Sequence, residues 1–120
     1  MSNTYNKVLL VGRLGKDPKS RTTADGMVIT DLVIADNYMK DGTEKVQWIP
    51  VRIFGKQAES CDKFLRKGRN VLVEGRIDIQ VYQDKQDLTK YTSVFTVVAS
   101  RVLFLDSNQK PNVPPTVAKI

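Results

Sequence analysis

The sequence predicts an all-β domain, a five-stranded Greek-key barrel with one helix between the third and fourth strands. Three observations lead to this fold class. Most of the chain consists of short apolar runs, rich in Val and Ile, that are separated by turn signals. One segment between the third and fourth runs has helical spacing instead. The length of 120 residues fits a single domain with a modest core.

The predicted strands are short runs of apolar, often β-branched residues that are broken by turn signals such as Gly, Pro and Asp. Gly12 and Gly75 interrupt two of them, which indicates a bulge or a tight bend of a barrel. Pro50 lies inside the third strand and cannot donate to a β-ladder, so it predicts an edge or a bulge there. The five strands cover residues 5–14, 27–35, 46–54, 70–82 and 91–105.

The helix is predicted over residues 56–67, with Gly68 as its C-cap. Its apolar face consists of Ala58, Cys61, Phe64 and Leu65. On that face Cys61 is a small core residue rather than a nucleophile. One helix between the third and fourth of five strands is the layout of the OB-fold, a partly open barrel. A small β-sandwich is the alternative, and the position of the helix argues against it.

The composition argues against catalysis and against a metal or another cofactor. Histidine is absent and Cys61 is the only cysteine, so neither a Ser-His-Asp triad nor a His- or thiolate-based zinc site can be built. The aspartates are scattered singly, mostly beside turn residues. Gly15-Lys16 and Gly55-Lys56 lack the remaining residues of a phosphate-binding loop. The sequence therefore predicts a binding protein and not an enzyme.

The charge favours a polyanionic partner. Nineteen Lys and Arg against thirteen Asp and Glu give a net charge of +6. The apolar run at residues 8–11 is too short for a signal peptide or a membrane span. We expect a soluble cytoplasmic protein without membrane association.

Trp48 is the most informative aromatic residue. OB barrels bind single strands through a basic groove and exposed aromatic side chains on which bases stack. Trp48 lies on the same side of the third strand as Arg52, which favours exposure, and a half-buried barrel Trp is an equal alternative. The opposite side is apolar: Ile49, Val51 and Ile53.

Three further aromatics are candidates for stacking. Phe54 ends the third strand and lies on the same side of it as Trp48. Tyr82 ends the fourth strand, and Tyr38 closes the second strand just before Lys40. Other aromatics are expected in the core: Phe64, Phe95 and Phe104. Phosphate contacts are predicted for basic residues around the barrel, each with solvated surface charge as its alternative. These are Lys7, Arg13, Lys16, Arg21, Arg52, Lys56, Arg69 and Arg76.

Several stretches in order resemble the bacterial-type single-stranded-DNA-binding protein family. They are NKVLLVGRLGKDP at 6–18, WIPVRIFGKQAE at 48–59, FLRKGRNVLVEGRI at 64–77, and the closing YTSVF and VLFL. The resemblance implies an OB-fold that forms a homotetramer or a related oligomer such as a dimer. It also implies base stacking on Trp48 and Phe54, with Tyr82 and, more loosely, Tyr38 at positions where members have tryptophan. Ile49-Pro50 departs from the His-Arg pair usual after the tryptophan, near the subunit contacts.

The function implied by the resemblance is sequence-tolerant binding of single-stranded DNA in replication, recombination and repair, at the nucleoid or the replication fork. Two alternatives are an OB-fold adaptor of a replication-restart assembly and an RNA-binding regulator. The domain is expected to span residues 1–105, followed by a flexible tail at 106–120 that is dispensable for DNA binding. The tail is not the acidic tip through which family members recruit partner proteins, so those partners are not expected.

Overall fold

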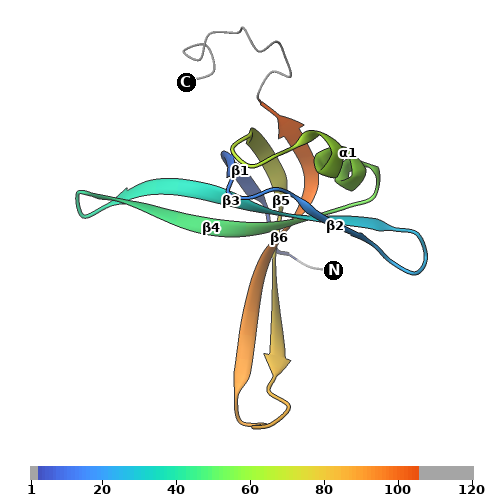
Figure 1. Ribbon diagram of the computed structural model, residues 1–120. Helices are drawn as coiled ribbons and strands as arrows, with labels where there is room; N and C mark the ends of the chain where they lie inside the picture. The colour runs from blue at the N-terminus through green and yellow to red at the C-terminus, as the bar shows by residue number, and fades with distance from the viewer. Residues whose placement is uncertain (1–2, 106–120) are drawn as a thin grey trace, which may run out of the picture.

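The computed structural model describes residues 3–105, and the expected tail lies outside this range. Six strands and one helix follow one another along the chain (Figure 1). They are β1 (Val8–Leu14), β2 (Lys19–Thr22), β3 (Val28–Lys40), β4 (Thr43–Phe54), α1 (Lys56–Phe64), β5 (Asn70–Gln83) and β6 (Tyr91–Phe104).

Five of the strands close into a barrel. The sheet order is β1-β5-β6-β4-β3-β2, and β1 also pairs with β3, which joins the two ends of the five-stranded part. All pairs are antiparallel except β4 with β6, which pair in parallel at Val51 and Arg52. With α1 between the third and fourth barrel strands, this arrangement confirms the predicted OB-fold.

The barrel closes where β1 changes partner near Gly12. Residues from Val8 to Arg13 pair with β5, whereas Arg13 and Leu14 pair with β3. A Cβ atom at Gly12 would lie only 2.5 Å from the backbone oxygen of Ala35. The absence of a side chain at Gly12 therefore lets β1 approach β3, as the predicted tight bend required.

The core is formed by the inward residues of the strands and by one face of α1. Its members include Leu32, Ile34, Val51, Ile53, Val71, Val73, Val97, Ala58, Cys61 and Leu65. The hydroxyl of Thr30 donates to the carbonyl oxygen of Ala58 at 2.8 Å and ties β3 to the helix. Burial raises the pKa of the Cys61 thiol to about 12, so this cysteine has no thiolate character at neutral pH. Its predicted place in the core is confirmed.

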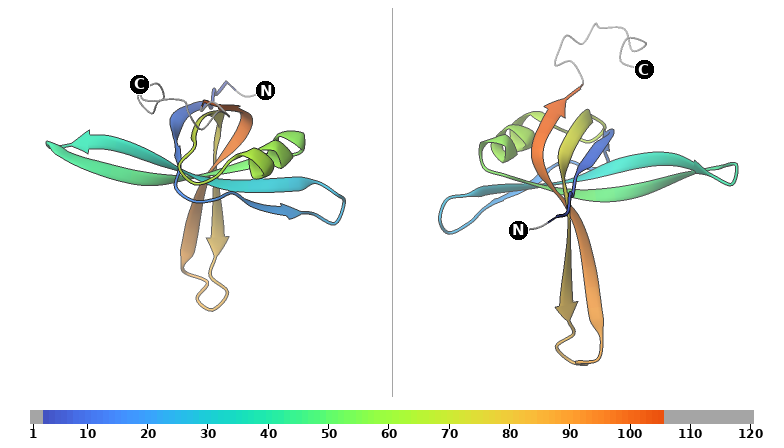
Figure 2. Two further views of the ribbon diagram at one scale, coloured as in Figure 1. Left: turned by 45° about the horizontal axis from the view of Figure 1, so that its top comes forward. Right: turned by 180° about the vertical axis from the view of Figure 1, so that it is seen from behind.

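Hairpins extend well beyond the barrel (Figures 1 and 2). Pairing between β3 and β4 continues to Lys40 opposite Thr43, and pairing between β5 and β6 continues to Gln83 opposite Tyr91. Pro50 lies on β4 just outside its short ladder with β6, so its missing N–H costs no pairing there. This agrees with the predicted edge position.

The structure corrects the sequence expectations at the following elements. The barrel is closed rather than partly open, and a sixth strand, β2, lies where only turns were expected. The helix ends at Phe64, three residues early, and Leu65 rather than Gly68 is its C-cap.

Three phenylalanines that were expected in the core are exposed. Phe64, Phe95 and Phe104 are 51%, 41% and 39% exposed. Leu65 occupies the core position at the end of α1. The ring of Phe64 lies outside the core, and the Lys63 ammonium is 5.5 Å from its centroid. Phe95 has the parity of the core side of β6, but it lies on the part of the β5–β6 hairpin that extends beyond the barrel, where no other element of residues 3–105 covers it (Figure 1).

Candidate nucleic-acid interface

Trp48, Arg52 and Phe54 share the outer face of β4. Their neighbours Val51 and Ile53 point into the core and are about 1% exposed, so the alternate residues point outward. Trp48 is 57% exposed and Phe54 is 43% exposed. More than half of the Trp48 side chain is therefore exposed, on the side of the strand that its parity with Arg52 predicts.

The same outer face continues onto β3 and β2. Arg52 lies directly opposite Asp31 of β3. Phe54 lies opposite Ile29 of β3, and Ile29 lies opposite Arg21 of β2. Asp31 accepts from the Nε of Arg52 at 2.8 Å and from the Nη1 of Arg21 at 3.1 Å. The carboxylate therefore joins two predicted phosphate-binding residues beside the aromatic side chains.

The indole of Trp48 lies against the turn that follows β1. Trp48 is opposite Ala35 of β3, and Ala35 is opposite Arg13 of β1. A Cβ atom at Gly15 would lie 2.5 Å from Cζ3 of the Trp48 ring. The bare backbone of Gly15 thus forms the surface on which the ring rests, with Arg13 on the same outer face.

The face also continues through β6 onto β5. Arg52 is opposite Val98 of β6, and Val98 is opposite Arg76 of β5. Because residues two apart on a strand share a face, Asp78 and Tyr82 follow Arg76 along it. The pKa of Arg52 is raised, first by its hydrogen bond to Asp31 and also by the charges of Tyr82 and Asp78. These residues are therefore electrostatic neighbours of Arg52.

Tyr38 does not share this face. It lies on β3 at the parity of Leu32 and Ile34, opposite Lys45, and so on the other side of the β3–β4 hairpin from Trp48. Its side chain is 38% exposed. The structure thus brings Trp48, Phe54 and Tyr82 onto one face and leaves Tyr38 apart.

The eight predicted phosphate contacts fall into two groups. Within residues 3–105, four of them form ion pairs: Lys7 with Glu74, Arg76 with Asp78, and Arg21 and Arg52 both with Asp31. The other four make no ion pair in that range: Arg13, Lys16, Lys56 and Arg69. The two groups differ in how readily their charge is available to a phosphate.

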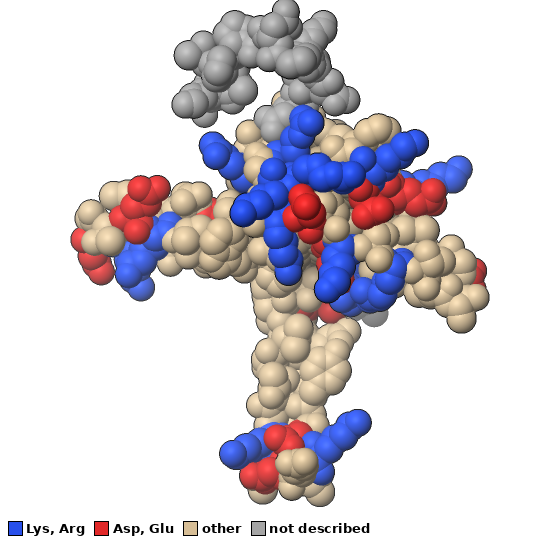
Figure 3. All heavy atoms as spheres, viewed as in Figure 1, with Lys and Arg blue, Asp and Glu red and all other residues tan. Residues whose placement is uncertain are grey.

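Positive charge gathers over the barrel and recurs at the tip of the β5–β6 hairpin, but not along the stem of this hairpin (Figure 3). The stem of this hairpin, residues 77–83 and 91–100, contains no Lys or Arg. Its contribution to an interface is therefore aromatic and apolar, from residues such as Tyr82, whose hydroxyl donates to Gln80.

The sequence analysis missed two residues of this face. Asp31 breaks the apolar run of β3, and a carboxylate inside such a run is a signal that its side of the strand faces outward. Gly15 appeared only as a fragment of a nucleotide loop. Nothing in the sequence indicates its contact with Trp48, which lies 33 positions later and depends on barrel closure.

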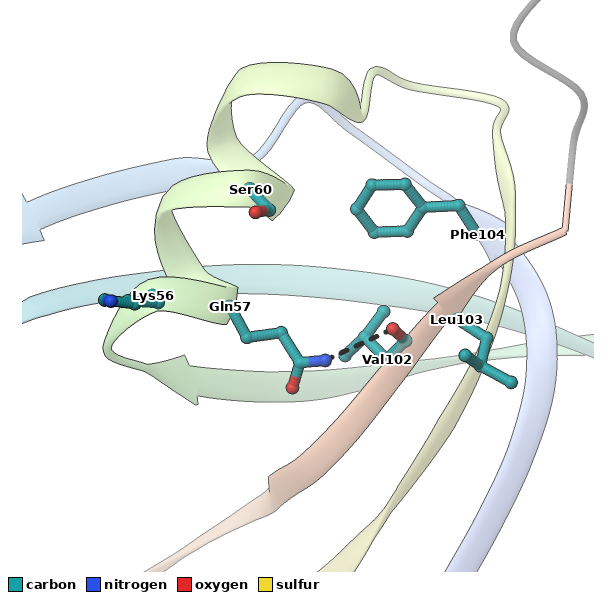
Figure 4. A pocket seen from close by; sticks show the side chains of 6 residues that line it. All are labelled: Lys56, Gln57, Ser60, Val102, Leu103 and Phe104. Atoms are coloured by element: carbon teal, nitrogen blue, oxygen red, sulfur yellow. Dashed lines mark hydrogen bonds between the residues drawn. The ribbon is translucent and has the colours of Figure 1, made fainter.

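A hollow of about 450 Å³ lies between α1 and the end of β6 (Figure 4). The amide Nε2 of Gln57 donates to the carbonyl oxygen of Val102 at 3.3 Å across it, and the ring of Phe104 faces the helix. This position at the rim explains why Phe104 is not part of the core. Lys56 is the only titratable side chain of the lining, so the hollow offers no acid–base pair.

Metal and membrane sites are not found in the described part of the chain. Among residues 3–105, no group of three His, Cys, Asp or Glu side chains is placed to hold a metal ion. No helix in this range is long and apolar enough to cross a membrane.

Comparison with known proteins agrees with this geometry. The sequence matches the single-strand binding protein family over residues 5–105. A single-stranded DNA-binding protein of Clostridium tetani is 39% identical over 108 residues, which cover 88% of this chain and 73% of the relative. One of Xanthomonas axonopodis pv. citri is 37% identical over 110 residues, 88% of this chain and 60% of the relative.

A solved structure has the same fold. The Plasmodium falciparum SSB complex with ssDNA superposes with a TM-score of 0.79 at 23% identity, over 88% of this chain and 99% of the other. At that identity the likeness concerns the fold. The family match over nearly all the described residues and the relative at 39% identity show that this chain belongs to the single-strand binding protein family.

Proposed function

We propose that this chain binds single-stranded DNA with little sequence preference and coats unpaired strands during replication, recombination and repair. The observation that supports this function best is the outer face of β4, where Trp48 and Phe54 are exposed on either side of Arg52. The activity is binding, and no reaction is part of the proposal. The names of the relatives agree with it.

Two physical interactions account for such binding. Unpaired bases stack on exposed aromatic rings, and every base has such a face, so the contact tolerates any sequence. Phosphates are attracted by the surrounding cations, and their bound counterions are released. We assign stacking to Trp48, Phe54 and Tyr82 on the shared face, with Tyr38 as a separate contact on the β3–β4 hairpin. Phosphates contact the eight predicted basic residues.

The test of this function compares single strands with duplexes. We expect oligo-dT to quench Trp48 fluorescence and to bind far more tightly than a duplex of equal length, because stacking requires unpaired bases. The logarithm of the affinity should fall linearly with the logarithm of the salt concentration, with a slope of about −0.7 for each phosphate neutralised. Equal affinity for the duplex would contradict the proposal, and tighter binding of oligo-U would favour an RNA-binding regulator.

Gly15 offers a sharper test of the role of Trp48. Gly15→Ala places a methyl group against the movable indole, so the ring rather than the backbone must shift. We expect oligo-dT binding to weaken by about 1 kcal/mol, a fraction of one base–aromatic contact. Fluorescence polarisation with labelled oligo-dT measures this loss, since it does not depend on Trp48. The same substitution in a Trp48→Ala background should have no further effect, and an equal loss in both backgrounds would show that Gly15 acts elsewhere.

We also propose that the chain forms a homotetramer, or a related oligomer such as a dimer, in which β1 pairs with a second copy. Between Val8 and Gly12, β1 pairs only with β5, so its other edge is open. Leu9 and Val11 are exposed beside this edge. By register Val11 continues into Leu72 of β5 and Leu103 of β6, which forms an apolar outer strip, whereas Leu9 lies opposite Glu74. Open edges and apolar strips of this kind are sites of association.

Sedimentation velocity tests this association. We expect the wild-type chain to sediment as an oligomer at micromolar concentration. Leu9→Lys with Val11→Lys should shift it toward the monomer, because charges would then face each other across the apolar strip. Met39→Lys, on the β3–β4 hairpin, is the matched exposed apolar-to-lysine control. A wild-type monomer at this concentration would contradict the proposal.

We propose that residues 1–105 form the whole DNA-binding domain. The barrel, the outer face of β4 and the β5–β6 hairpin all lie within this range. The first relatives extend beyond the matched segment, so partner proteins of such longer chains are not assigned to this one.

A further inference from the structure

Asp31 is a carboxylate in the middle of a face that is otherwise suited to an anionic ligand. It lies on β3 directly opposite Arg52 and on the same outer face as Trp48 and Phe54. Arg52 is two residues from Phe54 and four from Trp48, so it lies between the two aromatic residues along β4 and on the same face. A phosphate that links bases stacked on these rings would approach the guanidinium of Arg52.

Asp31 engages two arginines at once. Its Oδ1 accepts from Nε of Arg52 at 2.8 Å, and its Oδ2 accepts from Nη2 of Arg52 at 3.4 Å and from Nη1 of Arg21 at 3.1 Å. All three side chains are partly exposed: 36% for Asp31, 39% for Arg52 and 52% for Arg21. A solvent-accessible network of this kind can open when a competing anion arrives.

The charge state of Asp31 supports the same conclusion. Burial raises its pKa, but the hydrogen bonds and charges of Arg52 and then Arg21 outweigh burial and hold that pKa below its usual value. Asp31 is therefore ionised at neutral pH and offsets part of the positive charge on this face.

We propose that Asp31 competes with DNA phosphates for Arg21 and Arg52 and thereby limits the affinity of the interface. In the free protein the Asp31 carboxylate accepts hydrogen bonds from both guanidinium groups, and in the complex phosphate oxygens accept them instead. This inference rests on the proposed binding of single-stranded DNA. It makes Asp31 a positioning residue that sets how tightly and how salt-dependently the strand is held.

The opposing view is that Asp31 is structural. It would then join β2 to β4 through the two arginines, and its loss would loosen the face and weaken binding. The two views predict opposite signs for the same substitution.

The experiment compares Asp31→Asn with Asp36→Asn. Both substitutions remove one negative charge from β3. Asp36, however, lies on the other face of the strand and accepts from Nε2 of Gln47 at 2.8 Å instead of pairing with a cation. We expect D31N to bind oligo-dT about three- to tenfold more tightly than wild type at moderate salt. The slope of the logarithm of affinity against the logarithm of salt concentration should also be steeper, by about 0.7 for each additional phosphate neutralised. D36N should change affinity less than about twofold, as a distant charge does.

The outcomes separate this inference from the proposed function. If wild type binds oligo-dT but D31N binds no more tightly than D36N, or more weakly, the inference is wrong and the function stands. If wild type does not bind oligo-dT, the proposed function fails and the inference fails with it. Circular dichroism verifies the fold of each variant, and Asp31→Thr, which suits a strand, replaces D31N if that variant does not fold.

Discussion

Replacing Trp48 or Phe54 with Ala is expected to weaken oligo-dT binding by about 1–3 kcal/mol each, the value of one base–aromatic contact. The corresponding loss of affinity is roughly five- to 150-fold. Both side chains are about half exposed on the outer face of β4, so their truncation removes a stacking surface and little of the core. Fluorescence polarisation with labelled oligo-dT measures both variants, including the one without tryptophan.

The control for these substitutions is Phe64→Ala. Phe64 is 51% exposed, comparable with Trp48 and Phe54, but it lies at the end of α1 rather than on the outer face of β4. We expect this variant to bind oligo-dT as wild type does. If Trp48→Ala unfolds the barrel, or if Phe64→Ala loses as much affinity as Trp48→Ala, the assignment of stacking to the outer face of β4 would be wrong.

Gly75→Ala is expected to have the largest effect on stability. A Cβ atom at Gly75 would lie 2.2 Å from the backbone oxygen of Val98 and 2.9 Å from Cα of Ala99. Both atoms belong to the backbone of β6, so neither can move without breaking the pairing. We expect a loss of at least about 2 kcal/mol in the free energy of unfolding, as for other overpacked sites. The melting temperature should fall by roughly 10 °C.

The physical reason is the bulge at this point. Glu74 pairs with Arg101 but Gly75 pairs with Ala99, so Ser100 is an extra residue on β6. The bulge bends the strands where the barrel wall passes into the β5–β6 hairpin, and the bend brings β6 onto Gly75. Calorimetric melting of Gly75→Ala and of Gly42→Asn tests this. Asn tolerates the φ of +77° at Gly42, where no atom lies within 4 Å, so that control should melt near wild type.

Much of the fold follows from local patterns. The order of the five barrel strands and the helix is readable because alternation and helical spacing are properties of neighbouring residues. The same is true of the outer face of β4, since Ile49, Val51 and Ile53 mark its apolar side and Trp48 must then share the side of Arg52. The short β2 was missed because its four residues, Lys-Ser-Arg-Thr, contain no apolar alternation, and it forms by pairing with β3.

Alternation determines the side of a strand on which a residue lies, but not what covers that side. Phe95 has core parity and is exposed, because the β5–β6 hairpin leaves the barrel and no second layer within the described part of the chain packs against it (Figure 1). Tyr38 was grouped with Trp48 because both are aromatic, whereas the register of β3 against β4 places them on opposite faces. Which element packs over a strand face, and the register in which two strands pair, depend on segments that are distant in the sequence. Only the assembled barrel specifies them.

The sequence by itself determined an OB barrel with exposed aromatic residues and excess positive charge, because these depend on residue type and local spacing. The tertiary structure decided which residues meet. It placed Gly15 beneath Trp48 and set Asp31 between Arg21 and Arg52, pairs that are 10 to 33 positions apart in the chain. Contacts at such separations arise only when strands pair and the barrel closes, since their geometry depends on register rather than on any local pattern.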